Sequence, residues 1–257
     1  MARGRLRRGI YLLPTMFTIA NLFCGFASLV VASDGQYRRA AILIIVAGVL
    51  DGLDGRIARL TGTTSEFGLE FDSLADLVSF GIAPAVLVVH WSPVPVGTIS
   101  FVFLYVVCAA MRLARFNIRA TAGTDSKRFF AGLPSPAAAG LIASLVFAFP
   151  EPATTVPLAV VRTVVLILAA FLMVSRFRYH SFKDFDLRNR RSFMYALAIA
   201  ALLVPILAWP EGTLLLVAVV YVGSGPALYV AGLFGSRRPG AIDDRDAVEV
   251  TDGPAAR

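Results

Sequence analysis

Long apolar runs alternate along this chain with shorter polar connections that carry most of its charge. The runs are roughly 17–22 residues long, which is the length of an α-helix that crosses the hydrocarbon core of a bilayer. Runs without the strict alternation of barrel strands can satisfy their backbone groups in lipid only as helices. The pattern predicts an all-α fold, a polytopic transmembrane bundle of about eight helices, at about 13–33, 39–60, 68–90, 95–117, 134–150, 154–175, 192–209 and 212–234.

The first run follows four arginines, as the apolar region of a signal peptide would. Two features favour a retained helix instead. The run is long for a signal peptide, and Thr18, Asn21 and Gly25 give it one small, polar face at helical spacing.

Composition supports the membrane class, because 57% of the residues are hydrophobic and 16% are charged. A soluble domain carries about 45–50% and about 25%, respectively. Cys24 and Cys108 both lie in apolar runs, so they are interpreted as small core residues and not as a disulfide framework.

The distribution of Lys and Arg predicts the orientation. With the N-terminus inside, 21 of the 24 basic residues lie in or beside inner connections, and the exceptions are Arg38, Arg39 and Arg162. We therefore expect an N-in, C-in topology. The net charge of +7 then lines one membrane face, where anionic lipids attract it, and nucleic acid is not expected as a partner.

Three segments are expected along the chain. Residues 1–12 form a basic cytoplasmic N-terminal segment, 13–235 a transmembrane domain, and 236–257 a polar, disordered cytoplasmic tail.

Four aspartates interrupt the second and third apolar runs, and they are Asp51, Asp54, Asp72 and Asp76. Helical spacing places each pair on one face of its helix, and the short connection brings the two faces together near the cytoplasmic end. An ionised carboxylate inside a spanning helix costs about 2.5–3.5 kcal/mol, so a compensating positive charge is required. Oxygen ligands suit hard divalent cations such as Mg²⁺ or Mn²⁺, and four carboxylates could hold two of them. The alternatives are solvated helix ends and the ion path of a cation transporter.

The same stretch carries the pattern D-x-x-D-G-x-x-A-R, then eight residues, then G-x-x-x-D-x-x-x-D. It resembles the signature of the CDP-alcohol phosphatidyltransferase family and matches it without departure. The fixed positions are Asp51, Asp54, Gly55, Ala58, Arg59, Gly68, Asp72 and Asp76.

The resemblance implies an enzyme with a six-helix catalytic core plus two helices, two divalent cations (Mg²⁺ or Mn²⁺) and a homodimeric assembly. It also implies metal ligation by the four aspartates, with Asp76 in addition as the base that deprotonates the attacking alcohol. Residues implied for the nucleotide and diphosphate are Gly55, Ala58, Arg59, Gly68, Thr18 and Asn21; packing hydrogen bonds explain the last two equally well.

Further stretches are similar to the members of this family that use serine, and they are LPTMFTIANLFCGF, DSLADLVSFGIAP, RLARFN and KRFFAGLPSPAAAG. This similarity implies transfer of a phosphatidyl group from CDP-diacylglycerol to L-serine by direct in-line displacement, giving phosphatidylserine and CMP. Glycerol-3-phosphate or an inositol phosphate remains an alternative acceptor. The expected location is the cytoplasmic (inner) membrane, with the active site facing the cytoplasm.

Candidates for binding the acceptor or a lipid phosphate lie near these stretches, and they are Arg112, Arg115, Asn117, Lys127, Ser135 and Glu70. Either arginine could donate two hydrogen bonds to a carboxylate or a phosphate. Alternatively, it could anchor its helix at the lipid head groups. Glu70 could pair with an ammonium group or be a solvated acid, and Asn117 could cap a helix. His90 and His180 are expected to be interfacial, not catalytic.

Overall fold

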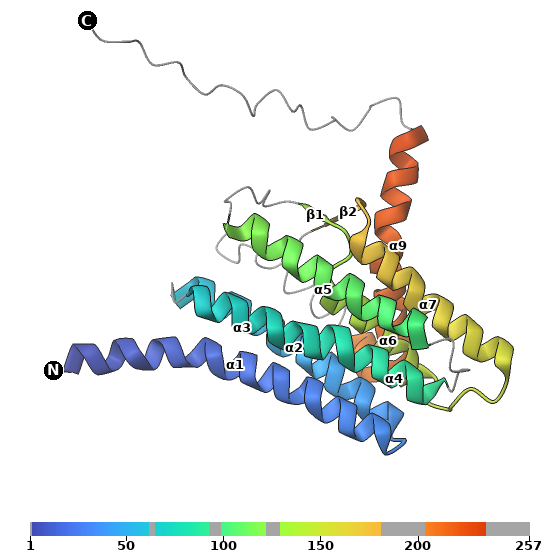
Figure 1. The fold of residues 1–257 in the computed structure, drawn as a ribbon, viewed down its shortest axis with the longest axis horizontal. Helices are drawn as coiled ribbons and strands as arrows, with labels where there is room; N and C mark the ends of the chain where they lie inside the picture. The colour runs from blue at the N-terminus through green and yellow to red at the C-terminus, as the bar shows by residue number, and fades with distance from the viewer. Residues whose placement is uncertain (1, 62–64, 93–98, 122–128, 181–203, 235–257) are drawn as a thin grey trace, which may run out of the picture.

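The computed structural model describes residues 2–61, 65–92, 99–121, 129–180 and 204–234. Within them the chain is a bundle of helices, which confirms the predicted polytopic helical fold (Figure 1). The helices are α1 (Ala2–Ser33), α2 (Tyr37–Thr61), α3 (Glu66–Asp76), η1 (Leu77–Ile82), α4 (Ala83–Trp91), α5 (Ile99–Thr121), α6 (Ser135–Ala148), α7 (Val156–Val174) and α9 (Pro210–Phe234).

Seven of the eight predicted runs coincide with these helices, since α3, η1 and α4 together form one rod. The run at 192–209 lies mostly outside the described residues, although 204–208 is helical. The first helix begins at Ala2, so residues 2–12 of the segment expected at 1–12 belong to α1. The tail expected at 236–257 also lies outside the described residues.

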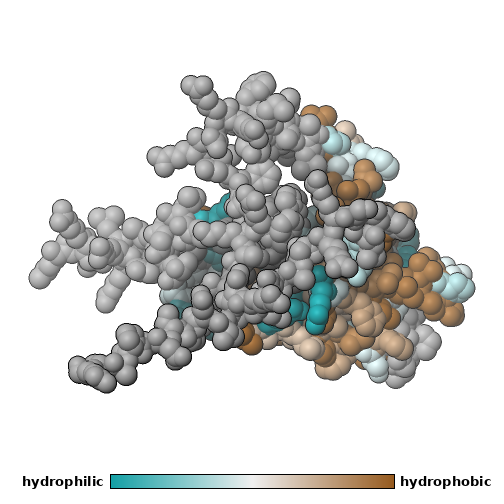
Figure 2. All heavy atoms as spheres, turned by 90° about the horizontal axis from the view of Figure 1, so that it is seen from above, coloured by the Kyte–Doolittle hydropathy of each residue, from teal (hydrophilic) through white to brown (hydrophobic). Residues whose placement is uncertain are grey.

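Five helices of the described part are long and apolar enough to cross a membrane, and they lie within Thr15–Ser33, Glu66–Trp91, Ile99–Ile118, Val156–Val174 and Pro210–Ala231. Their outward faces carry large apolar side chains such as Phe23, Phe101 and Phe171, each more than half exposed. Apolar residues cover much of the described surface on one side of the molecule (Figure 2). The chain is therefore an integral membrane protein.

The helix α6 lies between the two halves of the bundle. Its Ala138 and Ile142 pack in the core formed with α5 and α7, while Ala139 and Ala143 pack in the core formed with α1, α2 and α4. Small side chains on both faces let neighbouring helices approach closely. The sequence of α6, with its three consecutive alanines, therefore suits its central position.

The arginine inside the sixth apolar run is buried at the far end of the bundle from the aspartates. The Arg162 guanidinium donates to the carbonyls of Trp91 and Glu151, at 3.2 and 3.0 Å, and lies 3.6 Å from the centroid of the Trp91 ring. The last carbonyls of a helix have no N–H partner within it, and Arg162 supplies a donor to the Trp91 carbonyl at the end of α4. Its role is therefore structural.

Two short strands, β1 (Phe129–Ala131) and β2 (Arg178–His180), form an antiparallel pair that the sequence did not predict. The pair joins the segment before α6 to the segment after α7. Tyr179 of β2 is buried, and burial raises its pKa to about 12, so its hydroxyl stays protonated and donates to the Val222 carbonyl of α9 at 3.0 Å. The ribbon thereby attaches α9 to the rest of the bundle.

Gly132, directly after β1, adopts φ +87°, a conformation that residues other than glycine rarely adopt. Its N–H donates to the Phe177 carbonyl at 2.9 Å, and a Cβ there would lie 2.3 Å from the Met173 carbonyl oxygen. Gly35, in the turn between α1 and α2, has φ +76°, but a Cβ there would meet no described atom within 4 Å. The two glycines share the backbone requirement and differ in the space around them.

Gly132→Ala is expected to lower the free energy of unfolding by about 3 kcal/mol or more, because strain and a backbone clash act together. Gly35→Ala is the matched control, with the conformational cost alone, about 1–2 kcal/mol. Thermal unfolding in detergent compares them. Equal losses in the two variants would contradict the close approach of Gly132 to α7.

Candidate active site

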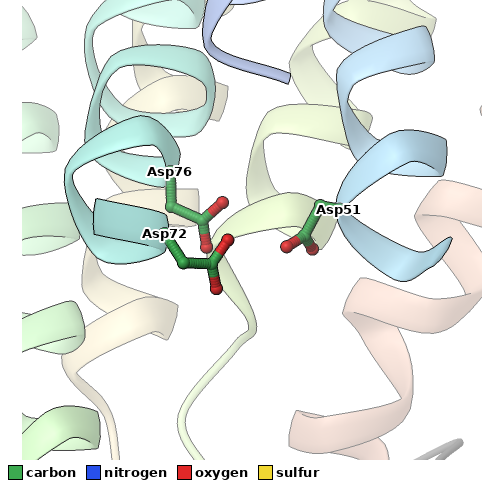
Figure 3. Close-up of side chains that lie close together, drawn as sticks. All are labelled: Asp51, Asp72 and Asp76. Carbon is green, nitrogen blue, oxygen red and sulfur yellow. The ribbon is translucent and has the colours of Figure 1, made fainter. Parts of the chain in front are cut away.

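Three aspartates from two helices point towards one another (Figure 3). Asp72 and Asp76 come from α3, and Asp51 comes from the facing side of α2. One carboxylate oxygen from each lies within 4.8 Å of the other two. Asp76 is the most buried of the three, with 8% of its surface exposed, while Asp51 and Asp72 are half-buried.

Local sequence explains why α3 presents its two carboxylates together. Ser65 caps the helix, and its hydroxyl accepts a hydrogen bond from the Gly68 N–H at 3.0 Å. Asp72 and Asp76 then follow one helical turn apart, so they share a face. A Cβ at Gly68 would lie 3.0 Å from that same hydroxyl, so the glycine accommodates the cap and its predicted contact with the diphosphate stays a prediction.

Asp54 is buried but lies outside the group of three. Three residues turn an α-helix by about 300°, so its side chain points about 60° away from that of Asp51. It faces α1, where the Thr18 hydroxyl donates to its Oδ2. The predicted role of Asp54 as a metal ligand therefore rests on its other carboxylate oxygen.

Two polar residues of α1 contact the aspartates directly. Thr18 bonds Asp54, and the Asn21 amide Nδ2 donates to Asp76 Oδ1 at 3.2 Å. Both α1 residues are buried. The structure thus places them at the site as partners of carboxylates, and their predicted contact with the nucleotide stays a prediction.

The donor atoms of the cluster fit a hard divalent cation. Asp72 Oδ1 is buried and has no hydrogen-bond partner among the described residues, and the same is true of Asn21 Oδ1. Three ionised carboxylates so close together repel one another unless a positive charge lies between them. Oxygen ligands of this kind are those that Mg²⁺ and Mn²⁺ prefer.

Among the described side chains, Arg112 of α5 is a basic residue that the structure brings to this cluster. It interacts electrostatically with Asp76 and Asp51, and its Nη1 donates to the buried Ser135 hydroxyl at 2.6 Å. Its Nε is buried without a partner among the described residues. Arg115, on the next turn, is exposed. Of the two predicted arginines, Arg112 is therefore the one beside the aspartates.

Glu70, Ser73 and Asn117 form a second polar cluster between α3 and α5. The Asn117 amide donates to the Ser73 hydroxyl at 2.9 Å and to the Glu70 carboxylate at 3.4 Å. Asn117 does not cap α5, because this helix continues to Thr121. The predicted roles of Glu70 and Asn117 towards the acceptor stay predictions, and their observed contacts join the two helices.

The remaining predicted residues are placed less fully. A Cβ added at Gly55 would meet no described atom within 4 Å, so there is open space beside Asp51 and Asp54. Ala58 and Arg59 belong to α2, but their side chains lie outside the described residues. Lys127 lies outside them as well. His90 is exposed at the end of α4, and His180 pairs with Phe129 in the β-ribbon.

The bundle and its cluster define the class of the chain: an integral membrane protein with an acidic site between two helices. A sequence model of the CDP-alcohol phosphatidyltransferase family matches residues 11–175, and the chain belongs to this family. It is therefore a membrane-integral transferase. The match covers the aspartates, Arg112 and Ser135, and it ends before α9.

Curated relatives narrow the comparison. The chain is 41% identical over 181 residues to the CDP-diacylglycerol–serine O-phosphatidyltransferase of Helicobacter pylori, covering 68% of this chain and 74% of the relative. It is 45% identical over 145 residues to the enzyme of the same name from Mycobacterium leprae, covering 54% and 48%. It is 38% identical over 136 residues to the archaetidylserine synthase of Methanothermobacter thermautotrophicus, covering 51% and 56%. The chain thus spans about half the length of these last two relatives.

Proposed function

We propose that this chain transfers the phosphatidyl group of CDP-diacylglycerol to L-serine, giving phosphatidylserine and CMP. The convergence of Asp51, Asp72 and Asp76 within the family signature is the observation that carries the proposal. The names of the similar proteins support serine as the acceptor, including a relative named for archaetidylserine. Free serine and a lipid-linked diphosphate meet naturally where a polar site lies at the end of a membrane bundle.

Two divalent cations, Mg²⁺ or Mn²⁺, are proposed at the acidic site. Asp51, Asp72 and Asp76 would hold them together with the remaining oxygen of Asp54. When bound, the ions supply positive charge that neutralises the diphosphate and stabilises the leaving phosphate. Without compensation, the same carboxylates would repel an anionic donor.

The reaction proposed is a single displacement. The serine hydroxyl oxygen forms a bond to the phosphorus that carries the diacylglycerol, the bond from this phosphorus to the bridging oxygen breaks, and CMP leaves with the electron pair. Asp76 takes the proton of the attacking hydroxyl. A covalent intermediate is not required, and Cys24 and Cys108, the natural nucleophiles for one, are buried in the apolar core.

The acceptor would be oriented by the basic residue beside the aspartates. A serine carboxylate can accept hydrogen bonds from the Arg112 guanidinium, whose planar donors match carboxylate geometry. The bond from Arg112 Nη1 to Ser135 holds the guanidinium beside the aspartates, and Nε makes no hydrogen bond to the described residues. Arg59 is proposed to bind the diphosphate, with room for the nucleotide beside Gly55 and Ala58.

An apolar groove along α2 is proposed to hold an acyl chain of the donor lipid. It has a volume of about 1150 Å³ and lies between α2, α6 and α9, with Arg56 among its lining residues. Its α2 wall runs from Ile44 to Arg56, about 18 Å at the helical rise. Apolar walls suit a lipid tail, and the arginine at the end nearest the aspartates suits a phosphate.

Topology and assembly complete the proposal. The transmembrane domain at 13–235 is placed in the cytoplasmic membrane, with both termini and the active site on the cytoplasmic side, because the basic residues gather there. The protein is proposed to act as a homodimer.

Acceptor-dependent CMP release from CDP-diacylglycerol by the purified protein tests the function. We expect release with L-serine in the presence of Mg²⁺ or Mn²⁺, and less than about one hundredth of that rate with glycerol-3-phosphate or an inositol phosphate, whose extra phosphate would need a larger basic pocket. Release with a phosphorylated alcohol alone would overturn the choice of acceptor. Metal flux in proteoliposomes without any CMP release would instead support a cation transporter.

A further inference from the structure

The rod that carries Asp72 and Asp76 changes its helical geometry immediately after Asp76. The segment η1 (Leu77–Ile82) is a π-helical turn between α3 and α4. At its end, the Ala83 N–H bonds the carbonyl of Val78, five residues back, where an α-helix would use a partner four residues back. Such a turn shifts the helix face before it relative to the face after it.

Pro84 explains the turn. A proline has no N–H, and its ring collides with the carbonyl four residues earlier, which here belongs to Phe80. The wider turn relieves this collision. Because Pro84 has no N–H to donate, the Phe80 carbonyl still lacks its usual helical donor. Tyr105 of α5 supplies the missing bond, since its hydroxyl donates to that carbonyl at 2.9 Å. Both Tyr105 and Phe80 are fully buried.

The opposite side of the turn is held by α1. The Ser79 hydroxyl donates to the Asn21 carbonyl at 3.0 Å, and the amide of the same Asn21 donates to Asp76. Gly25 permits this contact, because a Cβ there would lie 2.7 Å from the Ser79 Cα. One residue of α1 therefore bonds both the π-helical turn and the carboxylate that precedes it.

From these contacts we propose that Tyr105 is a positioning residue for the aspartates, acting through the π-helical turn. The buried face of α4 fixes the rod in the core through residues such as Leu87 and Trp91. Without the Tyr105 hydroxyl, the buried Phe80 carbonyl loses this donor and the turn can shift, so that α3 rotates relative to α4 by at most about 100°, the angle of one residue. Asp72 and Asp76 would then turn away from Asp51. This inference rests on the proposed function for its kinetic readout.

Tyr105→Phe removes one hydroxyl and tests the role directly. We expect kcat for serine-dependent CMP release to fall about 10- to 100-fold with KM values within about twofold, since a small misplacement of reacting groups costs this much. Mn²⁺ affinity, measured by titration in the absence of substrate, is expected to fall at least about fivefold.

Tyr179→Phe is the matched control. It also removes the hydroxyl of a fully buried tyrosine that donates to a backbone carbonyl, but in the β-ribbon. We expect a similar loss of thermal stability in both variants and unchanged kcat and Mn²⁺ affinity for Tyr179→Phe. Equal behaviour of the two variants in all three measurements would overturn the proposal.

Pro84→Ala tests the turn without removing a buried contact of Tyr105. Alanine restores the N–H and favours α-helical geometry, so the unfolding midpoint is expected to stay level or rise while kcat and Mn²⁺ affinity fall. Full kcat and full affinity in this variant would refute the inference. A wild-type protein that releases no CMP would refute the proposed function, and Mn²⁺ affinity would still decide the role of Tyr105.

Discussion

Asp76→Asn is expected to lower serine-dependent CMP release at least about 10³-fold while CDP-diacylglycerol still binds. The amide keeps the size of the carboxylate and can still accept a hydrogen bond from Asn21, so the packing around this buried position is preserved. It cannot accept the proton of the attacking hydroxyl, and general-base catalysis alone contributes about 10²–10⁴-fold. It also removes one charge from the proposed cation site. The measurements are kcat from CMP release and equilibrium binding of the donor lipid.

Asp34→Asn provides the matched control. Asp34 lies exposed in the turn between α1 and α2, at the other end of α2 from Asp51 and Asp54. Its substitution by asparagine removes one negative charge, as Asp76→Asn does. Its turnover is expected to equal that of the unsubstituted protein. If Asp76→Asn retained more than about one tenth of normal turnover, Asp76 could not be the base, and Asp72 would be the next carboxylate to test.

Helical periodicity was sufficient to predict the meeting of the aspartates. Asp72 and Asp76 are one turn apart, and a short connection forces α2 and α3 to run antiparallel, so Asp51 has to face them. The same periodicity could not separate Asp51 from Asp54, or Arg112 from Arg115. In each pair, three residues leave an angle of about 60°, and the contacts with α1 and α6 decide which side chain faces inwards.

Other features depend on contacts between segments that lie far apart in the sequence. The β-ribbon pairs Phe129 with His180, and no local pattern marks either segment as a strand. Pro84 lies inside the run predicted as one helix at 68–90, and the structure has a π-helical turn there, completed by Tyr105, 25 residues away from Phe80. From sequence, such a stretch is predicted as one continuous apolar helix, because the π-helical turn does not change its hydrophobicity.

Removal of divalent cations is expected to abolish turnover, to less than about 1% of the starting rate, and addition of Mg²⁺ or Mn²⁺ is expected to restore it. The physical reason is the close approach of Asp51, Asp72 and Asp76. At an effective dielectric constant of about 20, two unit charges separated by a distance of this order repel by about 3–4 kcal/mol. A bound cation converts this repulsion into attraction and lets the anionic donor approach.

The same argument predicts a change in stability that is independent of catalysis. A cation that binds the folded state at 100 times its dissociation constant stabilises that state by about 2.7 kcal/mol, so the unfolding midpoint should rise on titration with Mn²⁺. Asp72→Asn should weaken Mn²⁺ binding at least about tenfold, because Asp72 Oδ1 is a buried carboxylate oxygen with no hydrogen-bond partner among the described residues. Asp34→Asn should leave the titration unchanged.

A stoichiometry of two ions per chain is expected if Asp54 takes part beside Thr18, whereas one ion would confine the site to the three converging carboxylates. An unchanged midpoint and unchanged turnover after chelation would show that the cluster is neutralised by its own protons, and the proposal of a metal-dependent transfer would be wrong.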